Sequence, residues 1–384
     1  MQTAPIVRML SYRGNVYDAL LYKSVSPSSK HIIIIPGNPG VVNFYLEFAS
    51  TIFEGFRKLC SVHVVGHGGH GRAGGKHTNV SDNIALKLAY MEDLIERDNN
   101  TELVIIGHSL GSYMAVNLLR NISARHVQSV VCLFPCMKDF KGSEGPFLKL
   151  LRQPGLRHVA AGFVHTVSSV PWLRSAITNQ KDMHDDHRQT LHTMLNFQSI
   201  HNILALADDE SRHIVDFDWE IMRQNAAKIL FYFGEKDKWA PHHHYLELQA
   251  AFPEQTHLDA DGIPHAFVLG HSKAMGEKVV EFIRTGIKND GTFDQDEEEK
   301  VELEGEQLPD RPRRVRNHGS ATSEGSPISA QEELFIVSGV KEKEKEKERK
   351  KKKKRTGVST EKSHPLGIRS PRNPRKTAQA GKKH

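Results

Sequence analysis

Residues 102–116, Glu-Leu-Val-Ile-Ile-Gly-His-Ser-Leu-Gly-Ser-Tyr-Met-Ala-Val, decide the fold of this chain. The segment begins as a β-branched apolar run, which is typical of a strand buried on both faces, and continues with apolar residues at helical spacing. Between the two parts, Ser109 is flanked by Gly107 and Gly111. A serine on such a strand-to-helix turn presents its hydroxyl above the sheet, and the glycines let strand and helix pass closely. The pentapeptide alone also fits an ordinary Gly/Ser turn, but its strand and helix context favours a nucleophile.

Strand and helix patterns alternate on both sides of this segment. Besides the strand before Ser109, apolar runs predict strands at residues 6–12, 16–22, 31–35, 61–65, 127–134, 228–233 and 256–258. Helical spacing predicts helices over 44–56, over 84–95 with Ser81 or Asp82 as the cap, from 242 onward, and over 272–285. The alternation predicts an α/β-hydrolase type of α/β fold, with a mostly parallel eight-stranded sheet and helices on both faces.

One block without strand signals interrupts the alternation. Residues 138–226 are helix-like and separate two parts of the core, residues 1–137 and 227–288. We expect the block to form a helical cap over the carboxyl edge of the sheet, where open α/β sheets bind their ligands. The cap is therefore the expected source of specificity.

Part of this cap, residues 145–176, is unusually apolar for a surface insertion. It also contains the basic residues Lys149, Arg152, Arg157 and Arg174. Two interpretations fit this composition: helices that pack on the core, and helices that lie in a lipid interface with the cations and Trp172 at its rim. The sequence leaves both interpretations open.

The end of the chain differs in composition from the rest. Residues 289–384 consist of acidic, Pro/Gly/Ser-rich and Lys/Glu-rich runs, so we expect them to be disordered. Basic and acidic residues are equal in number over residues 1–290, and the net charge of +6 therefore arises from 291–384. The basic balance gives no reason to expect nucleic-acid binding by the folded part. Binding of RNA or anionic lipid by the Lys-rich end would depend on charge alone.

Cysteine content and hydropathy bear on the compartment. Three cysteines are too few for a disulfide framework. Residues 1–14 have no apolar signal-peptide core, and no segment has 18 uninterrupted apolar residues. We expect a reducing, cytosol-facing location and no transmembrane helix.

A nucleophilic serine needs a base and a third group that orients the base. In this type of sheet both should follow later in the chain, in the order Ser…Asp/Glu…His, at turns on the same edge. Asp237 comes just after the strand at 228–233 and is the expected acid, with Glu235 as the alternative. His265 follows the last strand and is the expected base, whereas His271 already enters the next helix.

The oxyanion of acyl transfer needs two N–H donors. We expect the backbone N–H groups of Leu110, directly after the serine, and of Asn38, in the turn Pro36-Gly37-Asn38-Pro39-Gly40. Two histidine groups, His67/His70/His77 and His242/His243/His244, lack an acidic partner at ligand spacing on one helix face. We therefore expect no metal site and no cofactor.

Five motifs together resemble those of the lipid-droplet-associated hydrolase family within the α/β-hydrolase superfamily. They are Pro36-Gly-Asn-Pro-Gly40 followed by Phe44-Tyr45, Gly66-His-Gly-Gly-His70, Gly107-His-Ser-Leu-Gly111, Gly234-x-x-Asp-x-Trp-x-Pro241 and Pro264-His-Ala-Phe-Val268. The resemblance covers roughly residues 1–288, and the long charged tail departs from it.

This resemblance implies a serine hydrolase with the triad Ser109, Asp237 and His265. The implied substrates are sterol esters or related neutral lipids, and the implied location is the cytosolic face of lipid droplets and the endoplasmic reticulum. The partners would be a lipid ester and the droplet monolayer or membrane surface. The alternative is a lipid-droplet-binding protein of weak or no catalytic activity that influences lipid storage and turnover.

Overall fold

The computed structural model describes residues 4–71, 75–171, 173, 175, 185–286 and 333–336. All of these belong to one unit of the chain, residues 1–338. The disorder expected for residues 289–384 concerns residues outside the described ones, apart from a short strand at 333–336. The side chains of Trp172 and Arg174 also lie outside the described part.

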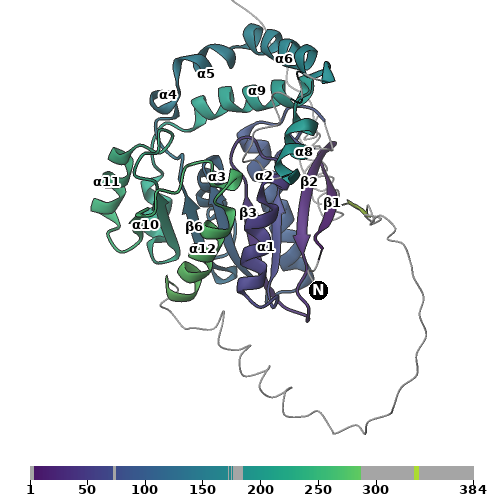
Figure 1. Ribbon diagram of the computed structural model, residues 1–384. Helices are drawn as coiled ribbons and strands as arrows, with labels where there is room; N and C mark the ends of the chain where they lie inside the picture. Colours follow the sequence, from purple (N-terminus) through teal and green to yellow (C-terminus); the bar gives the residue numbers. More distant parts are fainter. Residues whose placement is uncertain are drawn as a thin grey trace, which may run out of the picture. The chain divides into compact units, whose positions relative to one another are not determined.

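A mixed sheet forms the centre of the unit (Figure 1). Its strands in the described residues are β1 (Ile6–Tyr12), β2 (Asn15–Tyr22), β3 (Lys30–Ile35), β4 (Ser61–Val65), β5 (Glu102–His108), β6 (Val127–Leu133), β7 (Ile229–Phe233), β8 (Thr256–Leu258) and β9 (Glu333–Ile336). They are ordered β8-β7-β6-β5-β3-β4-β2-β1-β9. Neighbours are parallel from β8 to β4, and β2 is antiparallel to both β4 and β1. The predicted mostly parallel eight-stranded sheet is confirmed, and β9 adds a strand parallel to β1.

The helices also follow the predicted order. In the described residues they are α1 (Leu46–Gly55), α2 (Val80–Arg97), α3 (Leu110–Leu118), α4 (Phe140–Ser143), α5 (Pro146–Leu151), α6 (Pro154–Ser168), α8 (Asp185–Met194), α9 (Phe197–His213), α10 (Trp219–Gln224), α11 (His242–Ala251) and α12 (Ser272–Gly286). Within the part of the chain that the structure describes, every helix is too short or too polar to cross a membrane.

The predicted cap of α2 was wrong. Asn79 occupies the cap position in extended conformation, and its side-chain oxygen accepts a hydrogen bond from the backbone N–H of Asp82. Ser81 and Asp82 already lie inside the helix. Asparagine is among the best N-cap residues because its oxygen reaches an otherwise unpaired N–H of the first turn.

The central strands are buried on both faces because helices cover both. Ile32 and Ile34 of β3 belong to one apolar cluster with side chains of α1 and α12. Side chains alternate along a strand, so Ile33 and Ile35 face the opposite side, and all four are fully buried. Helix α3 packs on that opposite side against β5 and β6. Figure 1 shows α1 and α12 together in front of the sheet.

The block between β6 and β7 consists of α4 to α10 and, among its described residues, contains no strand. The proposed domain boundaries fall between β6 and α4 and just before β7. Within the block, α9 reaches the loops that follow β3 and β4. The side-chain amide of Asn202 donates to the carbonyl oxygen of Gly69 at 3.0 Å, and that of Asn38 donates to the carbonyl oxygen of Ile203 at 3.1 Å. The cap helices thus contact the carboxyl edge of the sheet.

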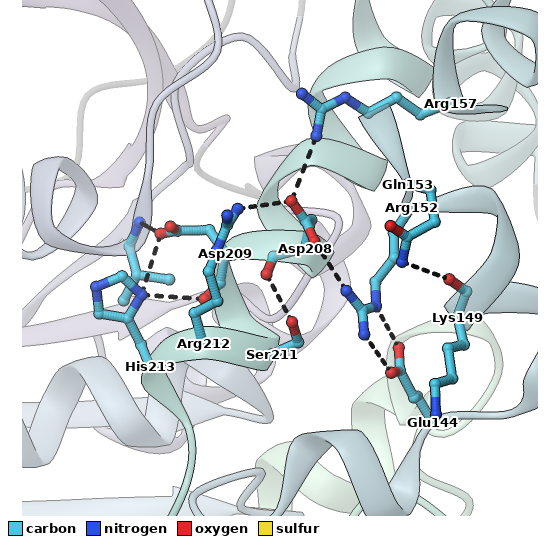
Figure 2. Close-up of polar contacts among 11 residues, drawn as sticks. Glu144, Lys149, Arg152, Gln153, Arg157, Asp208, Asp209, Ser211, Arg212 and His213 are labelled. Carbon is cyan, nitrogen blue, oxygen red and sulfur yellow. Dashed lines mark hydrogen bonds and ion pairs between the residues drawn. The ribbon is translucent and has the colours of Figure 1, made fainter. Parts of the chain in front are cut away.

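A buried ion cluster holds the cap helices together (Figure 2). The guanidinium of Arg152, which follows α5, binds Glu144 through two hydrogen bonds of 2.7 and 2.8 Å. It also donates to Asp208 of α9 at 2.8 Å. Of the two interpretations left open for residues 145–176, the one that places Arg152 at the rim of a lipid interface is wrong for this residue, because its side chain is only 7% exposed. The charge of Arg152 is paired with carboxylates inside the cap.

Candidate active site

Ser109 lies at the turn between β5 and α3. Its backbone has φ 54° and ψ −118°, a positive φ that residues with a side chain rarely adopt. A Cβ atom at Gly107 would lie 2.4 Å from the carbonyl oxygen of Gly111, and one at Gly111 would lie 2.1 Å from that of Ile35. The turn therefore requires glycine at both flanking positions, and its geometry is that of a nucleophile elbow.

Three side chains from separate loops meet in series at this turn. The ring Nδ1 of His265 donates to Oδ2 of Asp237 at 2.6 Å, because a carboxylate can only accept. Its Nε2 is then free to accept from the Ser109 hydroxyl, whose oxygen lies 3.0 Å away. The side chain of Asp237 is 1% exposed, and its Oδ1 accepts from the backbone N–H groups of Trp239 and Ala240 at 2.8 and 3.2 Å. The hydroxyl, imidazole and carboxylate are thus aligned for proton transfer.

The structure distinguishes Asp237 and His265 from the other acid and the other histidine that the sequence offers nearby. Glu235 and His271 are both exposed, and neither has a hydrogen bond to the triad side chains among the described residues. The loop carrying His265 is fixed at its start by Asp259, which accepts from the backbone N–H of Ile263 at 2.6 Å. Asp259 also accepts from the hydroxyl of Tyr232 on β7. The loop is therefore tied to the sheet beside the Asp237 turn.

The two expected oxyanion donors lie beside the serine. The N–H of Leu110 is the first of α3, where helical N–H groups have no partner inside the helix. A Cβ at Gly37 would lie 3.0 Å from the Cβ of Ser109, so the turn carrying Asn38 touches the elbow. The Gly37 N–H donates to Tyr45, whereas those of Asn38 and Leu110 make no hydrogen bond within the described residues. Both are thus available to a substrate oxygen.

Two buried residues that sequence reasoning did not assign connect the loops of this site. The hydroxyl of Tyr45 accepts from the Gly37 N–H at 2.9 Å and donates to Nδ1 of His108 at 2.7 Å. Nε2 of His108 in turn donates to the backbone carbonyl of His265 at 2.9 Å. Burial lowers the pKa of His108 to about 3, so the ring is neutral and can accept through Nδ1 while it donates through Nε2. Both residues stand within quoted motifs, but no sequence signal shows that they touch.

The histidines after β4 act in packing. A Cβ at Gly40 would lie 2.2 Å from Cγ of His67, and the Gly40 N–H donates to Nδ1 of His70 at 3.2 Å. The buried Nζ of Lys87 donates to Nδ1 of His67 at 2.9 Å. Burial lowers the pKa of both rings, to about 3 for His70. In the described part of the chain, no group of three or more His, Cys, Asp or Glu is arranged to hold a metal ion.

Comparison with known proteins places the chain in a family. The sequence profile described as lipid-droplet associated hydrolase matches residues 28–268, more than half of the chain. The chain belongs to the lipid-droplet associated hydrolase family. The relative of this name from Dictyostelium discoideum is 29% identical over 289 residues, which cover 72% of this chain and 94% of the relative. The one from Drosophila melanogaster is 31% identical over 274 residues, covering 66% and 88%.

Solved structures show the same fold. A carboxylesterase of the thaumarchaeon Nitrososphaera gargenis aligns with a TM-score of 0.53 and 16% identity, covering 73% of this chain and 100% of that chain. At such low identity the likeness shows the fold alone, since one fold serves many reactions. The predicted α/β-hydrolase fold is confirmed, and the chain is a member of a hydrolase family.

Proposed function

We propose that this chain is a serine hydrolase that cleaves carboxylic esters of neutral lipids, sterol esters among them, at the surface of lipid droplets or of the endoplasmic reticulum. The hydrogen-bonded series Asp237–His265–Ser109 is the observation that carries the proposal. Membership of a hydrolase family supports hydrolysis as the reaction. The family name supports the lipid droplet as the location.

The geometry supports an acyl-enzyme mechanism. Oγ of Ser109 attacks the ester carbonyl carbon while Nε2 of His265 takes the hydroxyl proton. Asp237 stabilises the resulting imidazolium and keeps the ring oriented. The N–H groups of Leu110 and Asn38 bind the oxyanion. His265 then gives the proton to the departing alcohol, and water activated by the same ring releases the acid.

The outer helices of the cap supply a surface suited to lipid. Five exposed apolar residues lie on α5 and α6: Phe147 (72% exposed), Leu150 (54%), Leu156 (41%), Val159 (68%) and Phe163 (68%). In Figure 1 these helices lie beyond α9, away from the sheet. Lys149 on α5 is exposed beside them. Exposed apolar residues on neighbouring helices with a cation nearby fit an interfacial contact with a lipid monolayer.

A substrate panel tests the reaction. The full chain should hydrolyse cholesteryl oleate, triolein or both in phospholipid-coated emulsions, and Ser109→Ala should lose this activity by several orders of magnitude. The variant removes only an oxygen, so its melting temperature should stay close to that of the wild type. Equal hydrolysis by both proteins, or none by the wild type on any ester, would overturn the proposed reaction and favour a lipid-binding role without catalysis.

A flotation assay tests the surface independently of activity. Replacing Phe147, Val159 and Phe163 together with serine should reduce recovery of the protein on triolein emulsions coated with phosphatidylcholine. Val215→Ser is the matched control, because Val215 is 65% exposed but lies outside α5 and α6. Unchanged recovery of the triple variant would remove α5 and α6 from the lipid contact.

A further inference from the structure

Helix α9 carries three consecutive acidic residues that contact three different parts of the molecule. Asp208 accepts from Arg152 in the ion cluster of the cap (Figure 2). Asp209 accepts from the first backbone N–H of α2 at 2.8 Å. Oε1 of Glu210 accepts from the side-chain amide of Asn38 at 2.7 Å. The third acidic residue thus binds the loop that carries the expected oxyanion donor.

Both hydrogens of the Asn38 amide are held by α9. One goes to the carbonyl oxygen of Ile203 at 3.1 Å and the other to Glu210, which is 3% exposed. A Cβ on the preceding residue, Gly37, would lie 3.0 Å from the Cβ of Ser109, so this turn runs close to the serine. The side chain of Asn38 is therefore fixed to the cap while its backbone N–H lies beside the serine. A shift of α9 would move this N–H relative to the reacting carbonyl.

We propose that Glu210 is a positioning residue that holds Asn38 so that its backbone N–H stays directed at the oxyanion, a role that rests on the proposed ester hydrolysis. Oxyanion donors act only when they are placed before the charge forms, and displacement of about 1 Å is costly. Arg152 binds Asp208 on the same helix. A displacement of the outer cap helices would therefore be transmitted through α9 to the loop that carries Asn38.

The surroundings of Glu210 keep it uncharged near neutral pH. Burial raises its pKa to about 8, against the Asn38 hydrogen bond, and the negative charges of Asp209 and Glu144 raise it further. The third titratable neighbour is Cys136, in the loop after β6. A neutral carboxyl accepts the amide hydrogen without placing a negative charge near the oxyanion. Above about pH 8 that charge would appear, and kcat should fall.

Two substitutions separate hydrogen bonding from titration. Glu210→Gln keeps an acceptor oxygen and cannot ionise, whereas Glu210→Leu has similar size and no acceptor. Asp209→Asn is the control, because Asp209 contacts the start of α2. The full-length proteins are compared by hydrogen exchange of the segment 36–40, by the rate at which a fluorophosphonate labels Ser109, and by ester kinetics from pH 6 to 9.

The expected result differs between the variants. Glu210→Leu should exchange faster at 36–40, label about tenfold more slowly, and lose about tenfold in kcat with KM within about twofold. Glu210→Gln should match the wild type at pH 7 and lack its decline above pH 8. Asp209→Asn should change exchange at residues 80–84 and leave the labelling rate unchanged at pH 6, well below the pKa of Glu210.

Two outcomes would overturn the role of Glu210. One is unchanged exchange at 36–40 in Glu210→Leu, which decides the matter whether or not the protein is an enzyme. The other is faster exchange with an unchanged labelling rate, provided that the wild type is labelled. A wild-type protein that is not labelled at Ser109 contradicts the proposed function instead, and the exchange data then decide separately whether Glu210 holds the loop.

Discussion

The core and the cap both position the loops of the site, but through different kinds of polar contact. On the core side, Tyr45 and His108 form hydrogen bonds while neutral, because burial raises the pKa of Tyr45 and lowers that of His108 to about 3. On the cap side, Arg152 binds the carboxylates of Glu144 and Asp208, and Glu210 titrates near pH 8. The hydrogen bonds on the core side therefore keep the same geometry at any pH near neutral, whereas the contacts on the cap side depend on the charge of their side chains. We expect the effects of changes on the core side to be independent of pH near neutral, and the effects of changes on the cap side to depend on charge.

The largest effect should come from the core acid. Asp237→Asn replaces the acceptor of the His265 Nδ1–H with an amide that can also donate, which permits the wrong ring tautomer. kcat should fall by roughly 10⁴ at pH 7, because the ring is then held in the wrong tautomer. Glu235→Gln is the matched control and should keep full activity, since Glu235 is exposed. Equal kinetics for Asp237→Asn and the wild type would remove Asp237 from the mechanism.

The ion cluster of the cap should show the largest effect on stability. Arg152→Met leaves the fully buried Glu144 side chain without its cation, and breaking a buried pair in this way costs about 3–5 kcal/mol. Arg212→Met removes a second partner of Asp208, but the Arg212 side chain is 60% exposed, so the loss should be below about 1 kcal/mol. Urea unfolding measures both. Similar unfolding midpoints for the two variants would show that Arg152 does not hold the cap together.

A smaller effect is expected from the core hydrogen-bond chain. Tyr45→Phe leaves the Gly37 N–H without its acceptor and His108 without its donor, a loss of about 1–3 kcal/mol in stability. The labelling rate of Ser109 should fall at every pH from 6 to 9, because no titrating group is removed. Tyr113→Phe serves as the comparison, since the Tyr113 hydroxyl donates a long, exposed hydrogen bond of 3.4 Å to the carbonyl oxygen of His213. A labelling defect that vanished at one end of this pH range would contradict the distinction between core and cap.

The most gradual effect should come from Glu210, because it is spread over several pH units. Its pKa is raised from 4.5 to about 8 in the folded protein, so the folded state binds a proton more tightly than the unfolded chain. Its contribution to stability is therefore full below about pH 4.5 and is lost as the pH rises toward 8, by at most about 1.4 kcal/mol per pH unit. The melting temperature of Glu210→Gln should fall less than that of the wild type between pH 5 and 8. Parallel decreases in both proteins would show that Glu210 does not titrate in this range.

The sequence predicted the core much better than the cap. The apolar runs 32–35 and 103–106 predict strands buried on both faces, and all eight side chains are buried. Gly107 and Gly111 mark the elbow because no other residue fits there. The burial of Arg152 could not be predicted, because a cation in an apolar segment gives no sign of partners that lie up to 56 residues away. Contacts between side chains that depend on the packing of separate elements, such as Glu210 with Asn38, cannot be predicted from local pattern.

One measurement tests the central claim, that three loops activate the hydroxyl of Ser109. The wild type is mixed with p-nitrophenyl butyrate, quenched with acid within the first turnover, digested and analysed by mass spectrometry. The peptide containing Ser109 should carry one butyryl group, and Ser109→Ala and His265→Gln should show none. An acyl group on a different residue, or hydrolysis by the wild type that persists undiminished in Ser109→Ala, would contradict the account.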